Sequence, residues 1–404
     1  ALASSLILIT MPKVFFQAHL LAMDFAVMVF VFLTTISFYY LLEKGDKKWI
    51  ALFAISLSFL LISKIIGYVV ILPLAIYGGY KFYMKSKAKE KPNMIKPLFI
   101  SLILTLVILF ILLFGNLLAL FYPFQSSQFK SGLGENKVQH FVLLFGNLVN
   151  SSSITATLFY VPMHLFTSFN ALLVLLVLLG FIFFIKNRKE HGVMPFLLLV
   201  FLTLYLIFSS PFMPKYDNER SFLLLFPFLA IFGGYGAKWI ADKIKIARSK
   251  AVVIAIITIL GFSTLYFAHP FYSSYFNAFV GGSKGVDERN TMTVTYWNPE
   301  ILQSLEYINS LPQGSQINIM KQPTVLLWYQ KVGKIRSDIN ISQGETENVI
   351  LTNEKAHLIK FSPLNERDTL LRWWYTKPTI YELKDRNRVS LVKIYRVEWE
   401  LYSK

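Results

Sequence analysis

The sequence predicts a multi-pass α-helical membrane bundle followed by a C-terminal soluble α/β domain. Of its 404 residues, 55% are hydrophobic and only 16% are charged, which lies outside the usual range of soluble enzymes. The apolar residues form long blocks up to residue 268, and the chain beyond that point has the composition of a water-soluble protein. Because such a change marks a change of solvent from lipid to water, we expect a membrane domain at 1–268 and an extracytoplasmic domain at 269–404.

Nine apolar blocks predict about nine membrane helices. The blocks are 1–12, 24–42, 49–63, 65–84, 97–122, 167–185, 194–210, 221–237 and 251–268. The first block is too short to cross a hydrocarbon core of about 30 Å. We therefore interpret it as the end of a helix that begins before Ala1.

Basic residues predict the orientation of the bundle. The net charge of +17 is concentrated in short loops between apolar blocks, at 44–48, 81–96, 186–189 and 238–250, while the alternate loops carry few Lys or Arg. The positive-inside rule makes the basic loops cytoplasmic. Everything from His269 onward then lies outside the cell membrane, and the charge needs no nucleic-acid partner. The absence of cysteine excludes a disulfide framework and a thiolate metal site.

Two connections on the outer side are unusual. Lys64 joins the blocks at 49–63 and 65–84 with almost no loop, so it is expected at or near low dielectric, where a lone cation is expensive unless it is paired. Lys64 therefore either binds an anion or extends to the membrane interface. The long segment at 123–166 is expected to lie partly along the membrane surface, because ordered loops of this length are mostly functional.

Single polar residues mark the outer ends of several helices. Asp24 opens a helix and His19 precedes it. An acid at this position either caps the helix and complements its dipole, or directs a carboxylate into an outward cavity. His140 and His164, in the outer segment, are each a candidate base, metal ligand or ordinary interface residue.

A group of four charged residues precedes the block at 221–237. The group consists of Lys215, Asp217, Glu219 and Arg220. These side chains either anchor the helix at the interface or form a cationic site for a phosphate, in which Arg220 holds two oxygens at once.

The C-terminal domain is predicted to mix helices and strands. Helices are expected at 299–311, with Asn298 as the cap, and at 323–329 and 368–375. Strands are expected at 316–320, 349–352, 380–383 and 389–397. Since this region has no glycine-rich phosphate loop and no Cys/His metal pattern, we expect a structural or acceptor-positioning domain.

Five segments, in this order, resemble the C-type membrane glycosyltransferases that use polyprenyl-phosphate sugars. This family includes the dolichyl-phosphate-mannose protein mannosyltransferases and the bacterial aminoarabinose transferases. The segments are 11–24, 61–73 (LISKIIGYVVILP), 140–165, 220–234 (RSFLLLFPFLAIFGG) and 269–282 (HPFYSSYFNAFVGG), of which the last is the most specific. The sequence departs from the family pattern at Ser63, where Thr is usual, and at Ser221, where Tyr is usual. The segment that follows at 295–311 resembles the family's Trp-containing helix opening, although Asn298 and Pro299 stand where the family has Gly-Gln.

The resemblance implies inverting transfer of a sugar from a polyprenyl phosphate to a protein, lipid or glycan acceptor on the outer face. The family's general base lies in an outer loop that would be upstream of Ala1, so Asp24 would be a supporting acid that orients the acceptor or a metal. Lys64, Arg220 and Lys215 would bind the donor phosphate, where negative charge develops as the glycosidic bond breaks. The loop over the sugar would include His140, Tyr160, His164, His19 and Glu219. Some relatives bind a divalent metal and others do not, so the cofactor stays open.

A membrane transporter or lipid-binding protein with an outer accessory domain is the alternative. Transporters usually carry polar groups or broken helices near the middle of the membrane, whereas the polar groups here collect at one face. A transferase should bring Asp24, Lys64 and Arg220 together, and a transporter should show a polar path through the bundle.

Overall fold

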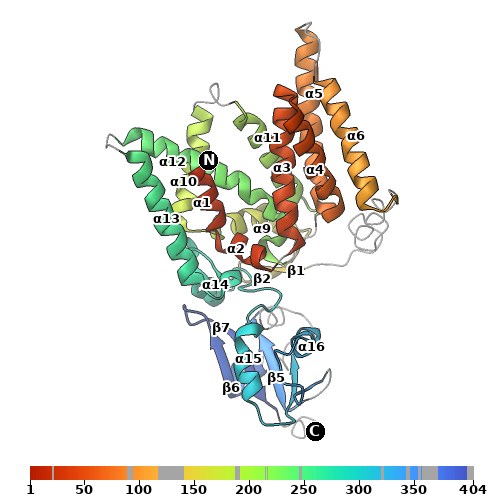
Figure 1. The fold of residues 1–404 in the computed structure, drawn as a ribbon. Coiled ribbons are helices and arrows are strands. Elements are labelled where there is room, and N and C mark those ends of the chain that lie inside the picture. Colours follow the sequence, from red (N-terminus) through yellow and green to blue (C-terminus); the bar gives the residue numbers. More distant parts are fainter. Residues whose placement is uncertain are drawn as a thin grey trace. The chain divides into compact units, whose positions relative to one another are not determined.

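The computed structural model describes two compact units (Figure 1). The described residues are 1–20, 22–88, 94–116, 141–186, 192–213, 215, 217–244, 248–319, 323–342, 346–353, 356 and 372–397. The first unit comprises 1–140 and 150–266, and the second comprises 141–149 and 267–404. The division after 266 lies two residues before the expected boundary.

The first unit is helical, and each of the nine apolar blocks forms helix in its described part. Its elements are α1 (Leu2–Ile9), α2 (Pro12–His19), α3 (Met23–Lys44), α4 (Lys47–Ser63), η1 (Ile65–Val70), α5 (Ile71–Lys87), α6 (Ile95–Leu112), α9 (Ile154–Thr167), α10 (Ala171–Lys186), α11 (Met194–Ser209), η4 (Asn218–Leu225), α12 (Phe226–Lys243) and α13 (Ser249–Ala268). Helix α3 packs against α4, α4 against α6, and α12 against both α1 and α10. The long outer segment is therefore not a plain loop, since α9 occupies its last part.

Among the described residues, five helical segments are long and apolar enough to cross a membrane. They are α3, η1 with α5, α6, η4 with α12, and α13. A sixth span results if α9 and α10, which are bent by 115° at a short break, count as one. Helices α4 and α11 are shorter, with 17 and 16 residues, so five or six of the nine expected spans meet this test.

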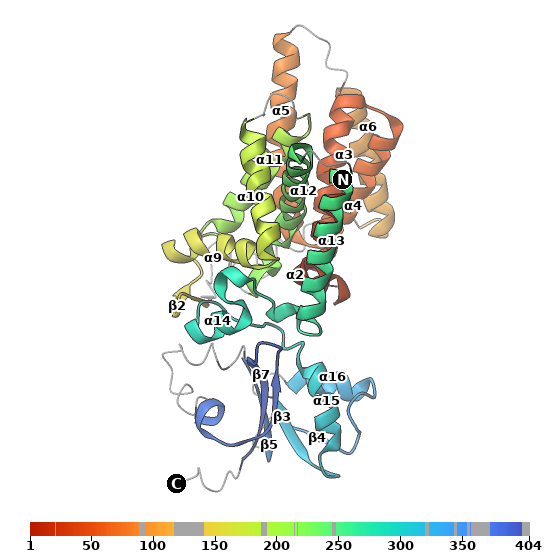
Figure 2. The same cartoon turned by 90° about the vertical axis from the view of Figure 1, so that its left-hand side faces the viewer.

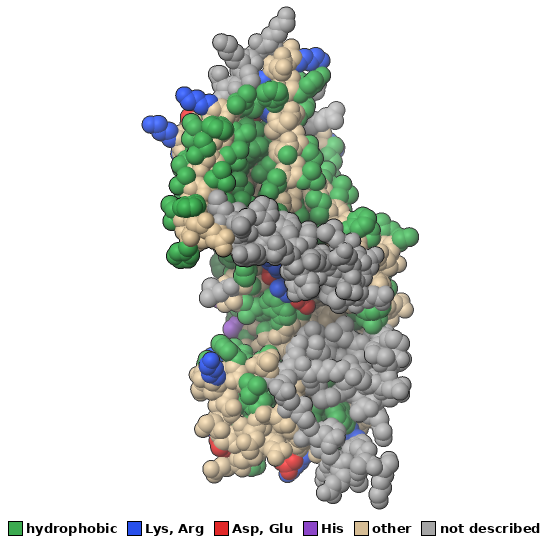
Figure 3. Space-filling model, turned by 90° about the vertical axis from the view of Figure 1, so that its right-hand side faces the viewer, with side chains coloured by type: hydrophobic (Ala, Val, Ile, Leu, Met, Phe, Trp, Pro, Cys, Tyr) green, Lys and Arg blue, Asp and Glu red, His purple; other side chains and the backbone are tan. Residues whose placement is uncertain are grey.

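The outer surface of these helices is apolar, as Figure 3 shows for one face. Large side chains such as Phe99 and Phe110 on α6, and Ile259 and Phe262 on α13, are exposed. A continuous exposed apolar surface of this kind suits contact with hydrocarbon rather than with water. It supports membrane association of the first unit.

Small residues allow two of the helices to approach closely. A Cβ atom added to Gly180 of α10 would lie 1.9 Å from the backbone oxygen of Phe232, and one added to Gly236 of α12 would lie 2.1 Å from the oxygen of Leu176. Glycine is needed at both positions because any side chain would collide with the facing backbone. Such close approach of two backbones stabilises helix association in a membrane, where the hydrophobic effect between helices is weak.

The second unit is built on a mixed five-stranded sheet (Figure 2) with strand order β4-β3-β5-β7-β6. The strands are β3 (Gln316–Ile319), β4 (Asn340–Ile341), β5 (Asn348–Thr352), β6 (Thr379–Lys384) and β7 (Ser390–Arg396), with helices α14 (Gly282–Arg289), α15 (Ile301–Ser310) and α16 (Pro323–Lys331). Strand β3 is parallel to β4 and β5, and β7 is antiparallel to β5 and β6. Val349 and Leu351 of β5 and Tyr395 of β7 pack in its core with Trp373 and Trp374.

A short hairpin from the outer segment belongs to this second unit. Its strands are β1 (Phe141–Leu144) and β2 (Asn147–Asn150). The backbone N–H groups of Phe145 and Gly146, in its turn, donate to the carbonyls of Thr291 (3.0 Å) and Asn290 (2.8 Å). Our expectation that the whole segment at 123–166 belongs to the membrane domain is therefore corrected for these residues.

The four predicted strands and the helix at 323–329 are confirmed, while the other helices need correction. Asn298 has a left-handed backbone (φ 51°), and α15 begins later, after Glu300 and without a side-chain cap. Of the helix expected at 368–375, residues 368–371 lie outside the described residues, and the rest is a single π-helical turn at Arg372–Thr376. Strand β4 was not predicted because two residues are too few to show alternation.

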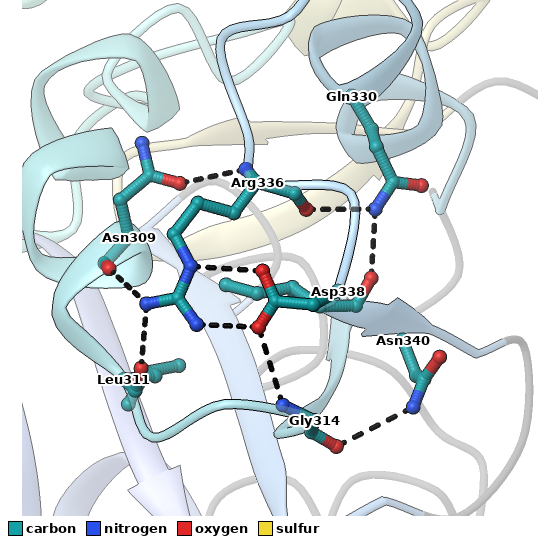
Figure 4. Close-up of polar contacts among 8 residues, drawn as sticks. Asn309, Leu311, Gly314, Gln330, Arg336, Asp338 and Asn340 are labelled. Carbon is teal, nitrogen blue, oxygen red and sulfur yellow. Dashed lines mark hydrogen bonds and ion pairs between the residues drawn. The ribbon is translucent and has the colours of Figure 1, made fainter.

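Arg336 ties the helices of the second unit to the edge of its sheet (Figure 4). Its Nη1 donates to the carbonyls of Asn309 (2.7 Å) and Leu311 (3.0 Å), at the end of α15, and its Nε donates to Asp338 (2.9 Å). The side chain of Gln330, from α16, donates to the Arg336 carbonyl (3.1 Å). Hydrogen bonding to Arg336 lowers the pKa of Asp338 to about 2.

Candidate functional site

Three of the predicted site residues meet at one end of the helical unit. The Asp24 carboxylate accepts from Lys64 through Oδ1, at 2.5 Å, and from the Nε of Arg220 through Oδ2, at 2.8 Å. These residues belong to three separate parts of the chain: the first turn of α3, the junction of α4 with η1, and η4. We call Asp24, Lys64 and Arg220 the ion triad.

The antiparallel pairing of α3 and α4 explains why Asp24 and Lys64 share an end. Helix α3 starts beside Asp24 and ends at Lys44, and α4 starts at Lys47 and runs back to Ser63. A helix of this length rises about 33 Å, so the ion triad and the basic connection from Lys44 to Lys47 lie at opposite ends. Asp24 also complements the dipole at the start of α3.

A sharp turn brings Lys64 to the triad. Its backbone is extended (φ −162°, ψ 140°), which ends α4, and η1 begins at the next residue. The turn is tight, because a Cβ on Gly67 would lie 2.4 Å from the side chain of Leu60. The Tyr68 hydroxyl donates to the Leu61 carbonyl at 2.7 Å and closes the turn.

Arg220 is held between two carboxylates. Its Nη1 contacts Asp217 at 2.6 Å, in addition to its bond with Asp24. Together with Lys64, the group contains two cations and two anions, so its formal charges cancel. Asp24 is the most buried member, with a side chain 4% exposed, against 26% for Lys64 and 20% for Arg220. Asp217 is 22% exposed, so an incoming anion would meet this carboxylate as well as the two cations, whereas Asp24 is shielded from it.

A second charged cluster surrounds Glu219, the residue of η4 that precedes Arg220. The Lys13 ammonium lies 3.5 Å from the Glu219 carboxylate, and the Nδ1 of His164 lies 4.0 Å from it. The Tyr160 hydroxyl donates to the Asn218 carbonyl at 3.2 Å, and its ring packs edge-on against His164. All of these side chains are buried. Burial lowers the pKa of Lys13, and the negative charge of Glu219 opposes that shift.

The predicted loop over the sugar is therefore corrected in part. Tyr160, His164 and Glu219 are core residues of the first unit rather than surface residues. His19 is exposed, and its Nδ1 pairs with the carbonyl of Phe15 in its own helix (2.8 Å). His140 lies outside the described residues.

Lys215 has a different environment from the one we expected. Its Nζ donates to three backbone carbonyls, those of Ser151 (3.1 Å), Ser210 (2.8 Å) and Met213 (3.4 Å). The side chain is buried, and burial lowers its pKa to about 8. Because an ammonium group has three hydrogens, these carbonyls use all of them. The contacts describe a structural brace between two connections, and the expected role in phosphate binding is corrected accordingly.

The catalytic base that the resemblance places upstream of Ala1 stays a prediction. Ala1 is not itself a site residue. It is exposed and stands at the N-cap position of α1, with no side-chain capping bond. Its carbonyl accepts from the backbone N–H of Ser5 at 3.0 Å, an ordinary bond of a first helical turn. The supporting role that the resemblance implies for Asp24 likewise stays a prediction.

Sequence reasoning missed the partners of the predicted residues. Lys13 is not among the predicted site residues, and its pairing with Glu219 was not foreseen. One signal was available, because a lysine within a short, mostly apolar helix requires a buried partner. The sequence does not say which of the acids that partner is.

The described parts of the chain contain no group of three or more His, Asp or Glu side chains placed to hold a metal ion. No protein-family model matches the chain, and no curated protein matches it. The case for a function therefore depends on the geometry of the ion triad and its surroundings.

Proposed function

We propose that this chain belongs to a membrane-embedded glycosyltransferase that moves a sugar from a polyprenyl-phosphate donor to an acceptor on the outer face of a cell membrane. In this proposal the first unit crosses the membrane several times, its basic helix ends face the cytoplasm, and the second unit is extracytoplasmic. The ion triad is the donor-phosphate site. The acceptor is a protein, a lipid or a glycan.

The observation that carries the proposal is the pairing of Asp24 with both Lys64 and Arg220. Two cations from distant parts of the chain converge at one end of an apolar bundle, where both keep partly exposed side chains. A polyprenyl-phosphate donor would place its phosphate at this end of the bundle and its polyprenyl chain along the apolar surface of the helices. Cations fixed in advance stabilise the charge that develops on the leaving phosphate as the glycosidic bond breaks.

The geometry also suggests how Asp24 would take part. In the absence of a donor, its carboxylate occupies the position of an anion between the two cations. A donor phosphate would compete for the same hydrogens, and each bond that moves to the phosphate would leave Asp24 freer to accept a proton or to orient a hydroxyl group. In this proposal Asp24 occupies the position of the phosphate when no donor is bound, and it is the supporting acid when the donor is bound.

The transporter alternative has one observation in its favour, the 115° bend between α9 and α10, but it receives less support from the polar groups of the described residues. Buried hydroxyl groups do occur within the bundle, at Thr35, Ser37, Ser58 and Thr105. Each of them donates to the backbone carbonyl four residues earlier in its own helix, at 2.7–2.9 Å. Ser37 also lies 3.5 Å from Ser56, Ser58 reaches the carbonyl of Thr105 at 3.3 Å, and the buried hydroxyls of Thr34 and Ser209 have no hydrogen-bond partner among the described residues. The four groups that are bonded within their own helix offer few contacts to a passing solute.

The test uses the full-length gene product in membranes, with a radiolabelled polyprenyl-phosphate sugar as donor. We expect Lys64→Ala and Arg220→Ala to raise the donor KM and to reduce transfer by about 100-fold, as is typical for losing one preorganised charge. Lys81→Ala is the matched control, since Lys81 pairs with Glu43 at the opposite end of the bundle. Unchanged transfer by both triad variants would refute the proposed site.

A further inference from the structure

The segment 217–220 is held from two sides by buried or half-buried contacts. On one side, Arg220 bonds to Asp24. On the other, Glu219 pairs with Lys13 at 3.5 Å, and both side chains are 0% exposed. The Tyr160 hydroxyl holds the carbonyl of Asn218 between them. Asn218 and Glu219 thus contact the second charged cluster, whereas Asp217 and Arg220, on either side of them, belong to the ion-triad side.

The backbone of this segment is strained. Asp217 and Asn218 both have left-handed conformations, with φ of 52° and 53°. Residues other than glycine adopt this conformation rarely, and Asp and Asn are among those that tolerate it best. Two in succession persist only when the surrounding contacts hold them, and Glu219 follows them directly.

We propose that the buried Lys13–Glu219 ion pair is a positioning device that sets the direction of Arg220 toward the donor phosphate. This inference rests on the proposed function. In this arrangement Glu219 does not contact the substrate, and it acts only through Arg220. Because adjacent residues point to opposite clusters, fixing Glu219 to α2 fixes the backbone from which Arg220 leaves.

A purely stabilising role explains the pair less well. Taking two charges out of water costs about as much as their attraction returns, so apolar or neutral replacements of a whole buried pair are often tolerated. Removing one partner alone is costly, because it leaves an uncompensated buried charge. The double variant Lys13→Met/Glu219→Gln removes both charges with little change in volume, so it separates positioning from stability.

The first experiment measures hydrogen–deuterium exchange of the full-length protein in detergent. We expect Lys13→Met/Glu219→Gln to keep a cooperative thermal transition but to exchange faster across 217–225. The control is Glu43→Gln, which breaks the pair with Lys81 at the opposite end of α3 and should leave this segment unchanged. Exchange at the wild-type rate in the double variant would overturn the inference, whether or not the protein proves to be a transferase.

The second experiment measures binding of a radiolabelled polyprenyl phosphate in a double-mutant cycle. We expect Lys13→Met/Glu219→Gln to weaken binding about tenfold when Arg220 is present, and to have little effect in the Arg220→Ala background, because coupled residues are not additive. The single variant Lys13→Arg keeps the positive charge opposite Glu219, so it should retain most of the wild-type affinity for the polyprenyl phosphate. An equal loss in both backgrounds would overturn the inference. A wild-type protein that binds no polyprenyl phosphate would instead refute the proposed function, and the exchange result would still decide whether the pair positions the segment.

Discussion

Asp24 has two roles in the proposed site: it stabilises Lys64 and Arg220, and it competes with a phosphate for them. Replacing Asp24 with Asn should therefore lower the stability of the protein and raise its affinity for the phosphate. The substitution keeps the size of the side chain and removes the charge that holds Lys64 and Arg220. Breaking a buried ion pair by removing one partner typically costs about 3–5 kcal/mol. Lys64 and Arg220 are 26% and 20% exposed, so water can solvate them after the change. We therefore expect a loss at or below the lower limit of that range, about 2–3 kcal/mol.

The same change should strengthen phosphate binding. In the wild-type protein, a phosphate that takes the position of Asp24 displaces two charge-assisted bonds, each worth about 1.5–3 kcal/mol. Asn offers one neutral oxygen in their place, so the competition is weaker. Part of the gain is lost because the cations are less well ordered, and we expect about tenfold tighter binding, equivalent to about 1.4 kcal/mol. Transfer should nevertheless fall, because the supporting acid is gone.

Thermal unfolding in detergent and equilibrium binding of a radiolabelled polyprenyl phosphate measure the two effects on the same preparations. Glu43→Gln is the control, since it removes a carboxylate from a pair at the other end of α3. It should affect stability slightly and binding not at all. Weaker phosphate binding by Asp24→Asn, with the control unchanged, would refute the reasoning that Asp24 occupies the position of the ligand.

Three further predictions concern packing, pH and orientation. Gly180→Val should destabilise the bundle by about 3 kcal/mol or prevent folding, because its Cβ would lie 1.9 Å from a backbone oxygen, a case of severe overpacking; Gly79→Ala, with nothing within 4 Å of its Cβ, should leave the thermal midpoint nearly unchanged. The pKa of Asp338 is about 2 when folded, against 3.8 as its ordinary value, so its contribution to stability is present above pH 3.8 and lost as the pH falls toward 2. Amide exchange across 309–340 should accelerate over that range, and a flat profile for Asp338→Asn would assign the effect to this group. Because the sequence has no cysteine, Ser337→Cys and Lys47→Cys are single labelling sites; a membrane-impermeant maleimide should label only Ser337→Cys in intact cells, and the opposite pattern would reverse the proposed topology.

Local properties of the chain were readable from the sequence. The lengths of the apolar blocks predicted the helices of the first unit, and alternation predicted the longer strands of the second, because both depend on neighbours within a few residues. An anion partner was also one of the two environments that the position of Lys64 predicted, since an isolated cation near hydrocarbon is expensive; the other was extension to the membrane interface. Sequence reasoning failed at β4, which is too short to alternate, and at Asn298, whose left-handed backbone no residue pattern announced.

The sequence by itself therefore determined where the apolar helices form and that some charges, such as Lys64, lie beside them. Only the tertiary structure decided which partners they find. Lys64 meets an aspartate 40 residues away, and Arg220 meets the same aspartate from a distance of 196 residues. Periodicity reports the environment of a side chain, whereas the pairing of charges depends on how distant helices pack. That is why Lys215, expected to bind phosphate, is instead a brace among backbone carbonyls, while Lys13, which drew no attention in the sequence, is the buried partner of Glu219.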